Sequence, residues 1–303
     1  MQKIRLGAIS RNYFNMPIWI AAHTGMFEQV GLDVSIELYE PIDEVWKRLQ
    51  DGRLDLALGV TEHIILDSES GGHLEIIGGN VNRLPFSLIT GKGIHSFQDM
   101  KGRTIGVSSV QAGSSSLVMK IMGSHGLHYP QDYNIVAVGP ILARWEKLQN
   151  GEIDAGLQGA PLNYIAQDLG FHSLCEPRDQ FPWFQFTSLN VDAHWAKAHH
   201  AAVVAFMKAF IRAHIWFYEN KQGSQNIAMQ ETGITAQYAD RAWEEYTSAE
   251  IFPRDARANP ESIQSLIDIS ALLRHVPKRA ESRAKSYINS VYIDEANLGL
   301  SAG

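Results

Sequence analysis

Apolar residues in the first part of the chain gather in short blocks with two different periods. Strand-length apolar blocks cover residues 4–10, 33–38 and 54–60. Between them, apolar positions recur at helical spacing, and Gly25 and Gly52 stand where those helices would end. This alternation predicts a β-α-β-α-β unit of the α/β class.

The same pattern occurs a second time. Residues 45–58 and 144–157 share one order of residue types, and Trp46 matches Trp145 at an offset of 99 residues, the difference between 145 and 46. Further pairs at this offset are Leu49 with Leu148, Gly52 with Gly151, Asp55 with Asp154, Gly7 with Gly106, and Pro41 with Pro140. Since separate elements match in one register, we predict two lobes built to the same plan.

The remaining segments complete the two lobes. Strands are predicted at residues 74–77, 85–90 and 187–191, whereas residues 78–83 and 176–186 are expected to be loops. Beyond Ala193 the spacing predicts a helical tail, with helices at residues 201–218, 224–231, 236–248 and 260–273. The returning strand places this tail on the first lobe. Lobe one is therefore expected to comprise residues 1–86 and 190–303, and lobe two residues 87–189.

Composition narrows the classes of function. The chain has 303 residues, of which 45% are hydrophobic and 19% charged, as is typical of a folded globular protein. A net charge of −7 and the lack of any Lys/Arg run argue against nucleic-acid binding. The single cysteine, Cys175, excludes an intramolecular disulfide and a multi-cysteine metal site. We expect no metal and no cofactor.

The N-terminus enters a strand at once and shows no basic segment followed by an apolar region. No uninterrupted apolar run is long enough to cross a bilayer, so no direct membrane insertion is expected. The protein is then periplasmic if a signal peptide was removed, or cytoplasmic if the chain is native as written.

The repeat also indicates where a ligand would bind, because ligands of open α/β sheets bind beyond the carboxyl ends of the strands. The loops at these ends should face one another across one cleft. They supply the candidate ligand-binding residues, which are Arg11, Asn12, Tyr13, Asn15, Thr61, Glu62, His63, Asn80, Asn82, Arg83, Ser108, Ser109, Gln111, Ser114, Ser115, Gln158, Trp183 and Phe184.

The segment Ser108–Ser115 has the composition of an anion site. It is small, rich in hydroxyl groups and leads into a helix, whose first N–H groups lack intrahelical partners. It is not a P-loop, because the Gly-Lys-Ser/Thr ending is missing. A helix cap is the structural alternative. If the ligand is anionic, Arg11 or Arg83 is expected to reach it from the other lobe, unless these are solvated surface arginines.

Aromatic residues at the strand ends have two interpretations. Tyr13, Phe14, Trp183, Phe184 and Phe186 form either an aromatic cage for a ligand or part of the core. Likewise, Asn80 and Asn82 are either turn residues or hydrogen-bond donors to a polar ligand. Glu62 and His63 are weak candidates for an acid–base pair, but no nucleophile or second carboxylate lies nearby in sequence, so a structural or ligand-contact role is favoured.

Several of these segments carry a family resemblance. Gly25-Met26-Phe27, Gly31-Leu32-Asp33-Val34 and residues 97–107 resemble the nitrate/sulfonate/taurine-type solute-binding proteins of ABC transporters, a family that includes thiamine-pyrimidine-synthase-like members. The resemblance implies a two-lobe, type II periplasmic-binding-protein fold. It also implies that a small organic solute, anionic or heterocyclic, binds in the cleft and is passed to an ABC permease. We expect a monomer whose lobes close by hinges at Pro85–Ser87 and Thr187–Asn190.

An enzyme on the same fold is the alternative. Related architectures include decarboxylases, desulfinases and pyrimidine synthases. The desulfinase resemblance implies a cysteine in the first loop, where this chain has Phe14-Asn15, and the pyrimidine-synthase resemblance implies a cysteine-rich motif, whereas only Cys175 is present. A metal-free decarboxylase or other lyase acting on an aromatic or heterocyclic acid remains as the enzymatic hypothesis.

Overall fold

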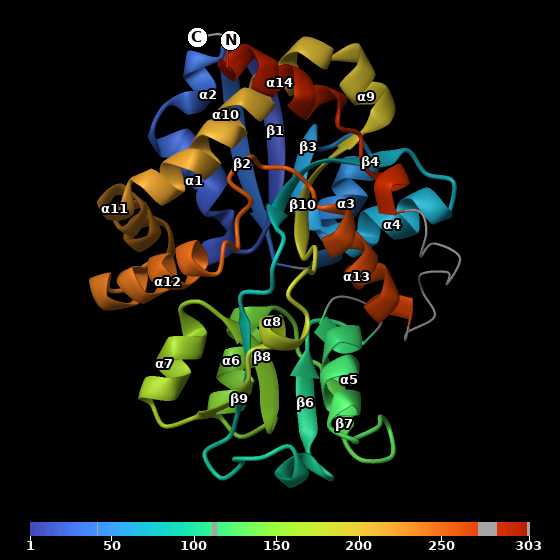
Figure 1. Ribbon diagram of the computed structural model, residues 1–303, viewed down its shortest axis with the longest axis vertical. Coiled ribbons are helices and arrows are strands. Elements are labelled where there is room, and N and C mark those ends of the chain that lie inside the picture. The colour runs from blue at the N-terminus through green and yellow to red at the C-terminus, as the bar shows by residue number, and fades with distance from the viewer. Residues whose placement is uncertain (41, 111–113, 272–283, 302–303) are drawn as a thin grey trace.

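Two five-stranded sheets, one in each lobe, form the framework of the computed structural model, which describes residues 1–40, 42–110, 114–271 and 284–301 (Figure 1). The first sheet has the order β2-β1-β3-β10-β4, and the second has the order β7-β6-β8-β5-β9. The strands of the first sheet are β1 (Gln2–Ile9), β2 (Leu32–Tyr39), β3 (Leu56–Val60), β4 (Leu74–Val81) and β10 (Thr187–Asp192). Those of the second are β5 (Phe86–Thr90), β6 (Thr104–Val107), β7 (Asn134–Ala137), β8 (Ala155–Gly159) and β9 (His172–Cys175). The predicted two-lobe α/β fold is confirmed.

Each sheet contains one strand that the chain forms directly after it crosses from the other lobe. β10 lies antiparallel between β3 and β4, and β5 lies antiparallel between β8 and β9. The two segments that cross between the lobes are bonded to each other, since the N–H of Phe184 donates to the carbonyl of Asn82 (3.1 Å) and that of Phe186 to Val81 (2.9 Å). Thr187–Asn190, an expected hinge, is instead paired on both sides within the first sheet, which leaves no free backbone to bend there.

The two copies of the repeat fold as equivalent units in separate sheets. Helices α3 (Ile42–Gln50) and α6 (Ile141–Gln149) carry Trp46 and Trp145 and pack on β3 and β8. The repeated aspartate has the same task in both copies. Asp55 accepts a hydrogen bond from the backbone N–H of Arg5, and Asp154 accepts one from Thr104, each at 2.8 Å. Residues 5 and 104 are themselves 99 positions apart, so the duplication prediction is confirmed at atomic detail. Pro41, which was matched with Pro140, lies outside the described residues.

Long-range pairing accounts for the differences from the predicted elements. Residues 78–81, expected in a loop, continue strand β4, because β10 pairs along them. The edge strand β9 was not predicted, and its four half-buried residues form a strand by pairing with β5. The sheets place Phe86 in the second lobe and residues 187–189 in the first, so the crossing points differ from the predicted lobe boundaries by a few residues.

Helices cover both sheets, and most of the C-terminal helices gather around the first lobe (Figure 1). Helix α10 (His200–Glu219) packs on α1 (Met16–His23) and α14 (Val291–Ser301). It is long and apolar enough to cross a membrane by composition, but 67% of that stretch is buried, as in a core helix. Helix α13 (Pro260–Ser270) contacts both lobes, through α4 (Thr61–Glu69) of the first and α5 (Ser114–Ser124) of the second. The remaining α-helices of the described residues are α2 (Met26–Gln29), α7 (Leu162–Asp168), α8 (Pro177–Gln180), α9 (Ala193–Ala198), α11 (Lys221–Thr232) and α12 (Ala236–Ser248).

Candidate ligand-binding site

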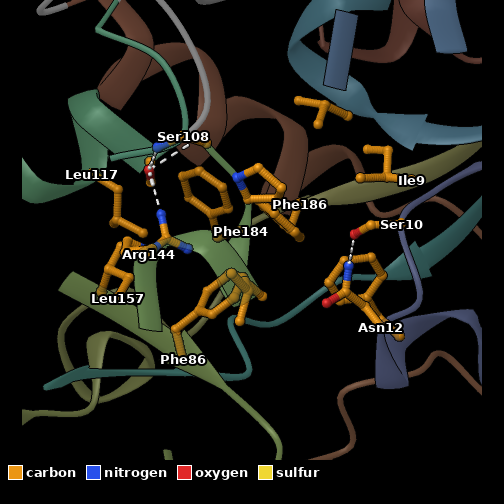
Figure 2. A pocket seen from close by; sticks show the side chains of 15 residues that line it. Ile9, Ser10, Asn12, Phe86, Ser108, Leu117, Arg144, Leu157, Phe184 and Phe186 are labelled. Carbon is orange, nitrogen blue, oxygen red and sulfur yellow. Dashed lines mark hydrogen bonds between the residues drawn. The ribbon is translucent and has the colours of Figure 1, made fainter. Parts of the chain in front are cut away.

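A cavity of about 40 Å³ lies between the lobes, at the carboxyl ends of the parallel strands (Figure 2). Ile9 and Val60 end strands β1 and β3 of the first lobe, and Ser108 follows β6 of the second. The full lining is Ile9, Ser10, Asn12, Phe14 and Val60 from the first lobe, Phe86, Ser108, Ser114, Leu117, Pro140, Ile141, Arg144 and Leu157 from the second, and Phe184 and Phe186 from a crossing segment. This is the position that the repeat predicts for a ligand.

Arg144 is the one titratable residue of this lining. It lies on α6, is 3% exposed, and donates from Nη1 to the Ser114 hydroxyl at 3.2 Å. Its Nε has no hydrogen-bond partner, and no acidic side chain within the described part of the chain forms an ion pair with it. Burial lowers the pKa of Arg144 to about 10, so it remains a cation at neutral pH. The cavity therefore contains a buried positive charge for which the described residues provide no counter-ion.

Gly156 makes room for the Arg144 side chain against the second sheet. A Cβ at position 156 would lie 2.8 Å from Cδ of Arg144 and 3.0 Å from its Cγ. In the other copy of the repeat, the position of Arg144 is taken by Val45 and that of Gly156 by Ala57, and both are core residues. The equivalent positions on the helix and the strand are thus Val and Ala in the first lobe and Arg and Gly in the second.

Two hydroxyl groups stand beside the guanidinium. The Ser108 N–H donates to Oγ of Ser114 at 3.0 Å, and the two Oγ atoms are 3.2 Å apart. Ser114 opens α5, whose first N–H groups have no intrahelical acceptors. Of the other residues predicted in this segment, Ser109 and Ser115 do not line the cavity, and Gln111 lies outside the described residues.

Phenylalanine rings form the rest of the wall. The Phe186 ring packs edge-on against Phe14 and Phe86, with centroid distances of 5.7 and 4.9 Å. Phe184 completes this group and is buried. Asn12 donates to the Ser10 hydroxyl. These two polar residues of the first lobe lie across the cavity from Leu117, Arg144 and Leu157 (Figure 2). Chemically, the site offers one cation, a few hydrogen-bonding groups and an apolar aromatic surface, which suits an anionic group attached to an apolar body.

Comparison with known proteins assigns the chain to a family. The family model described as "NMT1/THI5 like" matches residues 12–224. The chain belongs to the NMT1/THI5-like family. Among curated proteins, it is 31% identical over 147 residues to the 4-amino-5-hydroxymethyl-2-methylpyrimidine phosphate synthase of Schizosaccharomyces pombe, across 48% of this chain and 41% of that protein. The match thus spans less than half the length of the curated relative.

Solved structures similar to this NMT1/THI5-like chain share its fold at low identity. The periplasmic nitrate-binding protein NrtA from Synechocystis PCC 6803 superposes with a TM-score of 0.83 at 14% identity, covering 100% of this chain and 90% of that one. The alkanesulfonate-binding protein SsuA from Xanthomonas axonopodis pv. citri, bound to MOPS, superposes with a TM-score of 0.78 at 17% identity, covering 96% and 99%. The resemblance drawn from the sequence is confirmed.

Some predicted residues of this NMT1/THI5-like protein hold the first-lobe loop rather than line the cavity. Asn15 donates to the carbonyls of Ile9 (3.2 Å) and Ser10 (2.7 Å), and Asn80 donates to the carbonyl of Phe14 (2.8 Å). These bonds fix the loop that carries Asn12 and Phe14. Thr61 donates to the hydroxyl of Ser188 at 3.0 Å and so ties α4 to β10.

The two predicted arginines lie outside the cavity and already have acidic neighbours. Arg11 bonds both the carboxylate and the backbone carbonyl of Glu231 on α11. The Arg83 guanidinium lies 4.2 Å from the centroid of the Trp183 ring and 3.8 Å from the carboxylate of Glu250. Asn82, beside them, donates to the carbonyl of Arg257 at 2.9 Å.

The suggested acid–base pair, Glu62 and His63, also lies outside the lining. His63 packs against the Trp46 ring with centroids 5.5 Å apart, and burial lowers its pKa to about 4, so it is neutral at physiological pH. Glu62 is buried as well, and neither residue lines the cavity. Tyr13 packs edge-on against Tyr246 at 4.7 Å in the first-lobe core. Gln158 is buried on β8, and neither polar atom of its amide has a partner in the described residues.

Sequence reasoning did not select Arg144 or Phe86. Arg144 was visible as the first residue of the second repeat copy, where the first copy has Val45. A charged residue at a position where the other repeat copy has a buried apolar residue indicates a function. Burying the charge costs free energy, and folding alone does not require it. Phe86 carried no comparable signal, since an aromatic residue at the start of a strand is ordinary.

Proposed function

We propose that this protein captures a small organic anion in the cavity between its lobes and serves as the solute-binding component of an ABC-type importer. The observation that carries the proposal is the buried guanidinium of Arg144, whose Nε is unpaired and whose charge has no protein counter-ion among the described residues. A buried charge without a partner costs several kcal/mol. A bound anion would supply the missing charge and accept hydrogen bonds from Arg144 and the Ser108 and Ser114 hydroxyls.

The two-lobe architecture supports capture by closure. We propose that the lobes move as two bodies about the crossing segments, residues 82–85 and 176–186, because nothing but these segments connects one sheet covalently to the other. Anion binding at Arg144 in the second lobe, facing Ser10 and Asn12 of the first, would favour the closed arrangement.

The proposed partner and location follow the solute-binding proteins that share the fold. NrtA and SsuA are named as periplasmic or substrate-binding proteins for nitrate and alkanesulfonate, both anions. By analogy, we propose an ABC permease as the protein partner, a monomeric state and a periplasmic site of action.

An enzymatic role has support from the curated synthase relative, but the cavity favours binding. Its lining contains no carboxylate, histidine or thiol to serve as acid, base or nucleophile. Cys175, at the end of β9, is outside the lining, and burial raises its pKa to about 12, which suppresses its thiolate.

Native mass spectrometry of the gently purified protein tests the proposal directly. We expect a co-purified anion that is lost on denaturation and that rebinds in calorimetry to the wild type but not to Arg144→Met. An identified ligand that binds Arg144→Met as tightly as the wild type would refute the assignment. Turnover of that ligand in a purified preparation would favour the enzymatic alternative.

A further inference from the structure

A second hollow adjoins the cavity. It is a groove of about 320 Å³ between α7 of the second lobe and the turn that joins α11 to α12 in the C-terminal tail. Its walls are mainly apolar and include Leu142, Leu162 and Ile165 on one side and Ile234 and Tyr238 on the other. Leu142 is 48% exposed.

The groove and the cavity share part of their lining. Asn12 of the first lobe and Ile141 of the second line both of them. The two walls of the groove are also tied together, because the Tyr238 hydroxyl donates to the Asp168 carboxylate on α7 at 3.0 Å. The groove therefore lies next to the cavity that contains Arg144 and, like the cavity, is bounded by both lobes.

The two hollows differ in what they can hold. A water needs about 10–15 Å³ of such volume, and a dry cavity of about 150 Å³ accepts benzene. The inner cavity, at about 40 Å³, thus has room for a carboxylate- or sulfonate-sized group but not for a ring. The groove, at about 320 Å³, reaches the range of small-molecule pockets.

The charge distribution gives each hollow a different role. The cavity has the guanidinium of Arg144, whereas Arg11, the charged residue that lines the groove, is already engaged by Glu231. An apolar group placed in the groove would cover Leu142 and Ile234 and so remove apolar surface from water.

We infer that the ligand is an amphipathic organic anion whose charged group sits at Arg144 and whose apolar body lies in the groove between α7 and the α11–α12 turn. This inference rests on the proposed function and adds the class of ligand. It predicts discrimination by the body of the ligand, so that inorganic anions and anions with a single carbon substituent bind weakly.

The experiment compares matched probes by calorimetry. Methanesulfonate and acetate present the charged group alone, whereas benzenesulfonate and benzoate add a ring. We expect each ring-bearing probe to bind the wild type at least tenfold more tightly than its small counterpart. Leu142→Asp should abolish most of that difference. Because the new carboxylate repels both anions of a pair, the quantity compared is the ratio of their two affinities. Val291→Asp, at a 57% exposed position on α14 away from both hollows, is the matched control.

The outcomes separate the groove from the anion site. The assignment of the apolar body to the groove would be refuted if ring-bearing probes bind no better than small ones, or if Leu142→Asp keeps the tenfold preference. In either case, binding that depends on Arg144 would still support the proposed function. If no probe depends on Arg144, the proposed function fails and the groove assignment fails with it. A melting temperature within the range of the Val291→Asp control verifies that Leu142→Asp is folded, and Ile234→Asn provides an independent change on the opposite wall.

Discussion

Replacing Arg144 with methionine should stabilise the ligand-free protein while abolishing anion binding. Methionine retains the apolar stem of the side chain over Gly156 and removes the charge. Most substitutions of buried residues destabilise a protein, so a gain in stability is a discriminating result.

The expected size of the gain follows from the pKa of the guanidinium. Burial lowers this pKa from 12.5 to about 10, and each pKa unit corresponds to 1.36 kcal/mol, so the charged form carries a penalty of about 3 kcal/mol. Because the pKa is lower in the folded protein, the penalty is fully present below pH 10 and is lost as the pH rises from about 10 to the ordinary pKa of the unfolded chain. The lost bond to Ser114 offsets about 1 kcal/mol, so we expect a net gain of about 2 kcal/mol at pH 7.

Urea unfolding with and without ligand measures both effects. Without ligand, Arg144→Met should have the higher midpoint. With ligand at 100 times its dissociation constant, the wild type should gain about 2.7 kcal/mol and overtake it, whereas the variant should gain nothing. Arg178→Met is the contrasting control. Arg178 bonds the largely buried carboxylate of Glu245, so its removal should destabilise the protein by about 3 kcal/mol.

A loss of more than about 1 kcal/mol in ligand-free Arg144→Met would refute the reasoning. It would mean that the charge is stabilised within the protein itself, and the argument for an anionic ligand would lose its basis. A gain in stability with undiminished ligand affinity would place the anion elsewhere.

Other substitutions and conditions test separate parts of the structure. Gly156→Ala should displace the Arg144 side chain, because the new Cβ would lie 2.8 Å from its Cδ. Calorimetry should then show about tenfold weaker binding of the identified anion, with little change in melting temperature. Unchanged affinity would show that the Arg144 side chain can shift without loss of binding. Ser114→Leu should block the same anion while the fold survives, and a lost fold in a thermal melt would indicate a purely structural cap. Burial lowers the pKa of His214 from 6.5 to about 3, so the unfolded chain binds more protons below pH 6.5; stability should fall as the pH drops from 6.5 towards 3, and His214→Phe should flatten this dependence in urea titrations unless another group causes it. Ligand addition should reduce the radius of gyration in X-ray scattering, and an unchanged value with a ligand of proven affinity would contradict lobe closure.

The repeat made most of the fold predictable, because two copies with one register constrain each other. Strands β1 to β3 and β6 to β8 pair mainly through local β-α-β connections, and their positions followed from apolar blocks and glycine endings. The extension of β4 and the edge strand β9 could not be predicted, since their partners are β10 and β5, which return from the other lobe. Local patterns contain no information about such distant pairing.

The site was predictable where it depends on strand ends and not where it depends on the tail. Asn12, Ser108, Ser114 and Phe184 line the cavity. Asn12 and Ser108 stand in loops that directly follow the first strand of a unit, and Ser114 is the first residue of the helix after the second of these loops. Arg11 is held by Glu231, 220 residues away, so its pairing depends on where the helical tail packs. Periodicity predicts that a tail helix exists but not which lobe surface it covers.

The exchange of strands between the lobes has a consequence for synthesis. In the first sheet, β10 separates β3 from β4, although β4 is completed by Val81 and β10 ends at Asp192. A nascent chain that has emerged only as far as the second lobe therefore lacks an interior strand of this sheet, so the facing edges of β3 and β4 are both unpaired. Such edges pair readily with other chains. Fragments that end before Thr187 should aggregate, and folding of the N-terminal lobe should wait until the ribosome has released the returning strand.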